Sequence, residues 1–93
     1  MSKDHKVHRP VLPRHARYRW DELREQHQIV FPEGVLVLNE TGAAIVQRCD
    51  GRSTDELIAE LEKQYPGGRL AQDVAEFLER LADKGLVRDA ADS

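Results

Sequence analysis

The clearest pattern of apolar positions lies in the last third of the chain. Between residues 70 and 81, apolar side chains recur at i, i+4, i+7, i+8 and i+11, which places them on one face of a helix. Gly85 follows and is free to adopt the left-handed conformation that ends many helices. The pattern therefore predicts an amphipathic helix whose apolar face consists of Leu70, Val74, Phe77, Leu78 and Leu81.

Two shorter helices are predicted upstream, each from a cap at its N-terminus. Ser53 and Glu56 have the spacing of a capping box, in which each side chain binds the backbone amide of the other residue. Asn39 offers a side-chain oxygen to the first amides of an earlier helix. The earlier helix should run from about Glu40 to Cys49, and the later one from the capping box to about Tyr65.

The N-terminal half has the patterns of short strands. The segment Ala16–Trp20 alternates, with Ala16, Tyr18 and Trp20 on one face, which is the period of a half-buried strand. Gln28–Phe31 continues an inward face. A type I turn centred on Pro32-Glu33 then leads into the short apolar run Val35–Leu38.

These elements predict an α+β fold, with a three-stranded antiparallel N-terminal sheet followed by a three-helix cluster that is winged-helix-like. The polar connection Asp21–Gln26 between the first two strands is a loop or, alternatively, a short helix. We expect a flexible N-terminal tail over residues 1–8, one domain over residues 9–88 and a flexible C-terminus over residues 89–93. A chain of 93 residues is long enough for one modest core.

Charge is spread unevenly along the chain. Residues 1–30 carry seven Lys and Arg against four acids, whereas the rest carries seven against thirteen, so the helical part is acidic. Because nucleic-acid affinity rests on clustered Lys and Arg, we expect no nucleic-acid partner. No apolar run is long enough to cross a bilayer, and no signal peptide begins the chain, which predicts a cytoplasmic protein without a membrane partner.

The side chains that carry catalysis or bind metals form no convincing group. Cys49 is the lone cysteine, which excludes an internal disulfide, and it lies on an apolar helix stripe where a buried thiol is the common explanation. The four histidines, His5, His8, His15 and His27, lie in the N-terminal part without a third ligand placed nearby. We therefore predict no metal, no cofactor and no catalytic residues.

A surface for recognition is predicted at the third strand. If the strands follow one another in the sheet, Val35–Leu38 has one free edge, and no Lys, Pro or charge in this run blunts that edge. Such an edge suits the addition of a peptide strand. The alternatives are that the chain's own tail covers it or that a second copy pairs with it to form a homodimer.

Four segments of the chain match the pattern of a known family. They are Arg9-Pro10-x-Leu12-Pro13, Tyr18-x-Trp20-Asp21, Pro32-Glu33-Gly34-Val35-Leu36-x-Leu38-Asn39-Glu40-Thr41-Gly42-Ala43-Ala44-Ile45 and Cys49-Asp50-Gly51-x-Ser53-Thr54. With these segments the chain resembles the coenzyme PQQ synthesis protein D family (PqqD). The resemblance covers about residues 9–88 and is most specific in its centre, where Thr41-Gly42 departs mildly from the Thr-Ala pair usual in the family.

The resemblance implies a small non-catalytic peptide chaperone of pyrroloquinoline quinone biosynthesis. Such proteins are recognition elements for ribosomally made peptides (RiPPs). They bind a PqqA-like precursor peptide and present its Glu and Tyr to a PqqE-like radical S-adenosylmethionine (SAM) enzyme, which joins the two side chains. In related elements the peptide adds a strand beside the third strand and rests against the third helix.

The third helix supplies the second wall of the expected peptide site. We expect Phe77 and Leu81 to be buried against the first two helices, which leaves Val74 and Leu78 to line a cleft beside Val35 and Val37. Alternatively, the whole stripe is core. Arg69 and Arg80 are placed to bind carboxylates of an acidic peptide. The candidate peptide-binding residues are thus Val35, Leu36, Val37, Leu38, Arg69, Val74, Phe77, Leu78, Arg80 and Leu81.

A winged-helix DNA-binding protein is the alternative function. It requires a basic recognition helix. The third helix has four acids against three bases, so this alternative is the weaker one.

Overall fold

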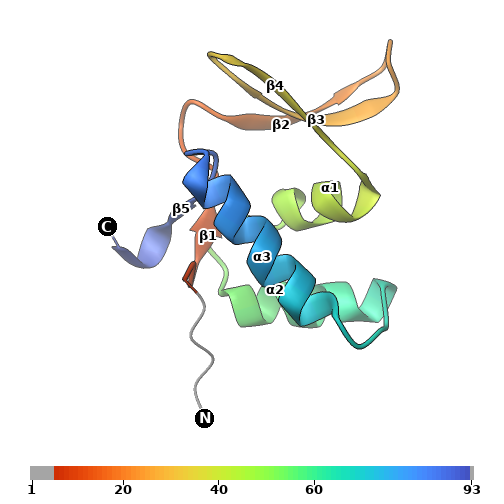
Figure 1. The fold of residues 1–93 in the computed structure, drawn as a ribbon, viewed down its shortest axis with the longest axis vertical. Helices are drawn as coiled ribbons and strands as arrows, with labels where there is room; N and C mark the ends of the chain where they lie inside the picture. The colour runs from red at the N-terminus through yellow and green to blue at the C-terminus, as the bar shows by residue number, and fades with distance from the viewer. Residues whose placement is uncertain (1–5, 93) are drawn as a thin grey trace.

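The computed structural model describes residues 6–92 and has the expected α+β architecture. A three-stranded antiparallel sheet packs on a cluster of three helices, and a small two-stranded sheet joins the two ends of the chain (Figure 1). The elements are β1 (Pro10–Val11), β2 (Arg17–Asp21), β3 (Gln26–Phe31), β4 (Gly34–Leu38), α1 (Glu40–Gln47), α2 (Thr54–Gln64), α3 (Leu70–Asp83), β5 (Arg88–Asp89) and the 3₁₀ helix η1 (Ala90–Asp92).

The three-stranded sheet has the order β2-β3-β4, so β3 is central and β4 lies at an edge. The connection between β2 and β3 is a turn, not the alternative short helix, because the buried Asp21 carboxylate accepts the amides of Leu23 (3.0 Å) and Arg24 (3.2 Å). Gln28 Nε2 also donates to this carboxylate, at 3.1 Å. Trp20 is 47% exposed although Tyr18, on the same face, is partly buried, so the expected inward face of the first strand is incomplete at its end.

The helix caps agree with the sequence. Asn39 Oδ1 accepts the amide of Gly42 at 2.7 Å, and the capping box of Ser53 and Glu56 is formed. The first helix ends at Gln47 and not at Cys49. The last amides bond three residues back, Cys49 to Val46 at 3.0 Å, and this tightens the final turn.

The C-terminal end of α3 has the hydrogen bonds of a Schellman motif. The amide of Leu86 donates to the carbonyl of Leu81 at 2.9 Å, and the amide of Gly85 donates to Ala82 at 3.0 Å. Gly85 has φ +76°, which a side chain would disfavour. The motif returns Leu86 and Val87 to the core, where both are buried.

The two ends of the chain are held together by β1, β5 and the side chain of Asp89. This carboxylate accepts the amides of His8 (2.8 Å) and Arg9 (2.9 Å). Val7 is only 6% exposed, and its carbonyl accepts a hydrogen bond from the buried hydroxyl of Thr54 at 2.6 Å. Within residues 6–92, the packed part of the chain therefore includes Val7 and Asp89, which lie outside the expected domain over residues 9–88.

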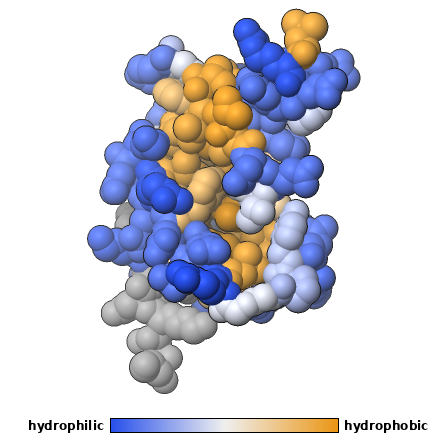
Figure 2. All heavy atoms as spheres, turned by 45° about the vertical axis from the view of Figure 1, so that its right-hand side comes forward, coloured by the Kyte–Doolittle hydropathy of each residue, from blue (hydrophilic) through white to orange (hydrophobic). Residues whose placement is uncertain are grey.

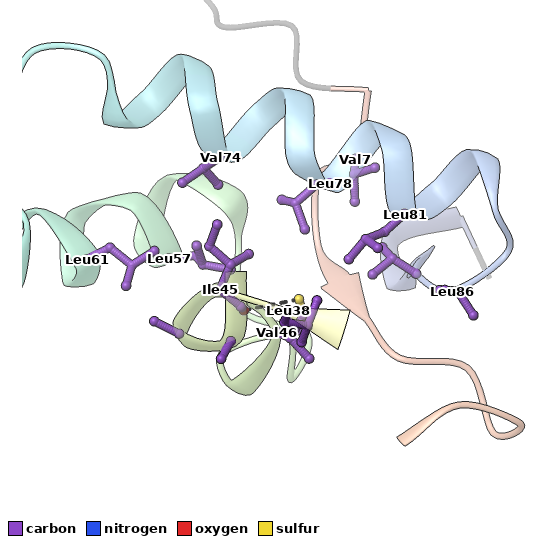
Figure 3. Close-up of a cluster of buried hydrophobic side chains, with 14 of the residues drawn as sticks. Val7, Leu38, Ile45, Val46, Leu57, Leu61, Val74, Leu78, Leu81 and Leu86 are labelled. Carbon is purple, nitrogen blue, oxygen red and sulfur yellow. Dashed lines mark hydrogen bonds between the residues drawn. The ribbon is translucent and has the colours of Figure 1, made fainter. Parts of the chain in front are cut away.

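The hydrophobic core lies between the three helices and the inner face of the sheet. Figure 3 shows its side chains converging from α1, α2, α3 and the end of β4, with Val7 among them. Val74 and Leu78 are 0% and 1% exposed, so the inner stripe of α3 is fully used in this packing. Within residues 6–92, no helix is long and apolar enough to span a membrane.

The hydrogen bond between Thr54 and Val7 gives a test of N-terminal docking. Thr54→Val keeps the side-chain shape but leaves the buried carbonyl of Val7 without its donor, so it should lower the free energy of unfolding by about 1–3 kcal/mol in urea titrations. Thr54→Ser keeps the hydroxyl and serves as the control. Equal protection of the residue 6–9 amides from hydrogen exchange in wild type and Thr54→Val would contradict this role.

Candidate functional site

A groove of about 490 Å³ lies between β4 and α3, with the first turns of α1 as its floor. It follows an apolar band that runs over this side of the molecule from the sheet to the helices, with hydrophilic residues along both sides (Figure 2). The lining residues are Leu36, Val37, Leu38, Asn39, Thr41, Gly42, Ile45, Asp73, Glu76, Phe77, Arg80, Leu81 and Lys84.

The free edge of β4 borders this groove. Within the described part of the chain, β3 is the only strand that pairs with β4, so the backbone groups on the other edge of β4 have no strand partner. Val35 and Val37 are 50% and 55% exposed, whereas Leu36 is partly buried and Leu38 is buried. This alternation places Val35 and Val37 on the outer face of the sheet, and Val35 does not line the groove.

The apolar side chains of α3 that line the groove are Phe77 and Leu81, and not Val74 or Leu78. The expectation for Phe77, Val74 and Leu78 was the reverse, because it assigned Phe77 to the core. Phe77 lies at the edge of the apolar stripe, on a flank where polar residues follow at helical spacing, and it is only partly buried. Leu81 lines the groove and is also buried, as expected.

Gly42 allows the Phe77 ring to lie against the first turn of α1. A Cβ at this position would lie 3.2 Å from Phe77 Cζ and 3.1 Å from Asn39 Oδ1, tighter than ordinary contact. Glycine costs an α-helix about 1 kcal/mol relative to alanine. The close approach of α3 explains this glycine.

The charged residues of the groove come from α3 and from Lys84, the residue that caps its C-terminus. Arg80, for which carboxylate binding stays a prediction, lines the groove together with Lys84, Asp73 and Glu76, which the sequence reasoning did not select. Arg69 precedes α3 and is not among the lining residues. A spacing in the sequence could have identified this flank of the helix. It is the i, i+4, i+7, i+11 spacing of Asp73, Phe77, Arg80 and Lys84.

Cys49 is a buried thiol just after α1. Its Sγ donates to the carbonyl of Ile45 at 3.3 Å, and burial, with a smaller effect of Asp50, raises its pKa to about 12. A thiol held neutral in this way is a poor nucleophile.

The histidines are dispersed. His27 Nδ1 lies 2.7 Å from the hydroxyl of Tyr18, and His15 Nε2 lies 3.2 Å from the carbonyl of Gly85. His5 falls outside the described residues. Within residues 6–92, no group of three or more His, Cys, Asp or Glu side chains is placed to hold a metal ion.

A second hollow, of about 510 Å³, lies beside α2 but is lined by charges that pair with one another. Asp50 and Arg52 are 2.9 Å apart, and this hydrogen-bonded guanidinium lowers the pKa of Asp50 to about 2. Lys63 lies 3.7 Å from Glu60. With its charges paired and little apolar surface, this hollow offers less to a ligand than the groove at the β4 edge.

Comparison with known proteins identifies the family of this chain. The sequence model of the family described as coenzyme PQQ synthesis protein D (PqqD) matches residues 26–87, which include β3, β4 and all three helices. The chain belongs to this family. The resemblance noted in the sequence is thus confirmed.

Similar proteins agree with this assignment. A PqqA binding protein of Rhodopseudomonas palustris (strain BisB5) is 42% identical over 88 residues, which cover 91% of this chain and 86% of that protein. A PqqA binding protein of Methylococcus capsulatus (strain Bath) is 36% identical over 74 residues, 78% of this chain and 80% of that one.

A solved structure also matches. It is the solution NMR structure of the PqqD truncation of Methylobacterium extorquens PqqCD, described as a functional and stand-alone RiPP recognition element. The TM-score is 0.72 at 29% identity, over 85% of this chain and 87% of that one. The DNA-binding alternative gains no support from these matches.

The contact between Gly42 and Phe77 predicts the effect of a small substitution. Gly42→Ala should push the Phe77 ring outward, while the gain in helix propensity, about 1 kcal/mol, offsets the crowding and keeps the protein folded. The ring proton shifts of Phe77 should move in NMR spectra. Gly67→Ala, where a Cβ meets nothing within 4 Å, is the control. Unmoved Phe77 resonances in Gly42→Ala would contradict the contact.

The raised pKa of Cys49 predicts slow thiol labelling and a loss of stability at high pH. At pH 8, Ellman's reagent should react roughly a hundredfold more slowly with native than with urea-unfolded protein, because reaction requires opening of the fold. The pKa of Cys49 in the folded protein, about 12, lies above the ordinary value of 9.0. The contribution of this thiol to the free energy of unfolding is therefore fully present below pH 9, and it decreases as the pH rises toward 12. Cys49→Ala should lack this component, and fast native labelling would refute the burial.

Proposed function

We propose that this chain binds a PqqA-type precursor peptide by strand addition at the free edge of β4. The observation that carries the proposal is the position of this edge beside a groove whose opposite wall is Phe77 on α3. Membership of the PqqD family and the names of the similar PqqA binding proteins support the peptide as ligand.

Strand addition fits the chemistry of the site. Backbone amides and carbonyls of a peptide satisfy the unpaired groups of β4, and this gives affinity without regard to sequence. Alternate peptide side chains then point toward the groove, where Leu36, Leu81 and Phe77 offer apolar surface. Specificity depends on these alternate positions.

The role beyond binding is presentation of the peptide to a partner enzyme. We infer that the bound peptide presents its Glu and Tyr to a radical SAM enzyme that crosslinks them, and that the chain itself is not catalytic and works in the cytoplasm. The buried, neutral thiol of Cys49 agrees with a binding role. Turnover of the precursor peptide by the purified chain alone would contradict it.

A second copy is a competing occupant of the same edge. A homodimer formed through β4 would cover the edge in the absence of peptide, so peptide and dimer would exclude each other. Sedimentation measured with and without peptide distinguishes this from a dimer formed elsewhere, since only the edge-to-edge dimer should dissociate as peptide binds.

A substitution in β4 tests strand addition. Val37→Pro removes a backbone donor from β4 and places a ring at its edge, so it should weaken binding of the precursor peptide roughly tenfold or more in isothermal titration. Leu23→Lys, which changes a side chain 94% exposed in the β2–β3 turn and not among the groove-lining residues, should bind like wild type.

The fold of the Val37→Pro variant must be checked in the same experiment. Its circular dichroism spectrum and urea midpoint should stay close to those of wild type, because the change lies at an edge strand. Wild-type affinity in a folded Val37→Pro protein would refute strand addition at this edge.

A further inference from the structure

The groove-facing flank of α3 has its charges sorted by sign along the helix. Asp73 and Glu76 lie in its N-terminal half, and Arg80 and Lys84 lie at its C-terminal end. All four side chains are exposed. Within residues 6–92, none of the ion pairs involves them, and Glu76 accepts only a hydrogen bond from Gln72, at 3.1 Å. The rim of the groove therefore presents unpaired negative charge at one end and unpaired positive charge at the other.

The fold fixes how these two ends lie relative to β4. In Figure 1, β4 runs from the upper left toward the start of α1 on the right, while α3 runs from the lower right to the upper left. The contact between Phe77 and Gly42 joins the middle of α3 to the first turn of α1. The acidic end of the rim thus lies toward the C-terminal end of β4, and the basic end lies toward its N-terminal end.

We propose that this charge order selects the direction and the charge pattern of the bound peptide. The peptide lies antiparallel to β4, with basic residues in its N-terminal part beside Asp73 and Glu76 and acidic residues in its C-terminal part beside Arg80 and Lys84. This proposal rests on the proposed function, because it concerns the same groove. It adds the order of charges along the ligand, which strand addition alone does not specify.

Two physical arguments favour this direction. Antiparallel pairs are slightly more stable per residue than parallel pairs and occur more often. The free termini of a peptide also carry a positive charge first and a negative charge last, in the same order as the complementary rim. Charges at the rim of a binding site contribute to orientation and selectivity more than to affinity, so the apolar groove and the β4 edge still hold the peptide.

A pair of synthetic peptides tests the charge order directly. Both have a neutral core of alternating Val and Thr. One has a pair of lysines before the core and a pair of glutamates after it, and the other has these pairs exchanged. The wild-type chain should bind the lysine-first peptide roughly fivefold to tenfold more tightly in fluorescence titrations at low salt, since several exposed charge pairs act together. The difference should shrink in high salt because exposed charges are screened.

The matched protein variant exchanges the signs on the rim. Asp73→Lys, Glu76→Lys, Arg80→Glu and Lys84→Glu together keep the net charge, and this variant should prefer the glutamate-first peptide. The control is Glu62→Lys with Lys63→Glu on the exposed side of α2, which should keep the wild-type preference. Thermal unfolding followed by circular dichroism shows whether each variant is folded. For a rim variant that does not fold, Arg80→Glu with Lys84→Glu alone should remove the preference.

The possible outcomes separate this inference from the proposed function. Equal affinities of wild type for the two peptides, or a preference that the rim exchange leaves unchanged, would overturn the charge order while leaving strand addition intact. A wild-type preference for the glutamate-first peptide would overturn the stated direction. Failure of wild type to bind either of these peptides or a PqqA precursor peptide would overturn the proposed function and this inference with it.

Discussion

The burial of one stripe of α3 against the other helices and the sheet sets the geometry of the whole molecule. Leu70, Val74, Leu78 and Leu81 are all buried, and burying each such side chain contributes about 1.5–3 kcal/mol. Together this is comparable to the entire net stability of a small domain, about 5–15 kcal/mol. The helix therefore cannot turn about its axis without losing the fold. Because its rotation is fixed, the flank that carries Phe77 and the four rim charges must face β4, and the core thus determines which residues of α3 are offered to a ligand.

The joint between β4 and α1 is the second constraint on the groove. Leu38 is buried at the end of the strand, Asn39 caps the helix that follows at once, and no loop separates the two. Because the strand leads directly into the helix, the free edge of β4 is held at a fixed distance from α3. Gly42, in the first turn, then determines how deeply the Phe77 ring can sit. The width of the groove is consequently set by rigid elements and one ring, which suits a site that must accept an extended backbone without rearrangement.

The sequence predicted the features that depend on nearby residues and failed where distant segments meet. Asn39, Ser53 with Glu56, and Gly85 were assigned correctly because caps are formed within one turn of chain. The order of the strands followed from alternation and a short turn. By contrast, the sequence assigned Phe77 to the core and Val74 and Leu78 to the groove, and the structure shows the reverse. These residues lie on adjoining parts of one helix face, and only tertiary packing decides how the helix is rotated about its axis. The bonds of Asp89 to His8 and Arg9 join residues 80 or more positions apart, and no local pattern announces them.

The two flanks of α3 separate stability from recognition within a single helix. An edge strand without charge or proline is a hazard, because any extended chain can pair with it. Here the edge itself has no strand partner within residues 6–92, and under the proposed charge order the selection falls to exposed side chains across the groove. Substitutions of Asp73, Glu76, Arg80 or Lys84 are thus free to change what binds at little cost in folding, whereas a change in the buried stripe alters both. Phe77 belongs to both sets, since its ring rests on Gly42 and also lines the groove. This division benefits a protein that must keep one fold while its peptide partner changes. Substitutions on the flank can then change the ligand specificity while the buried stripe stays the same.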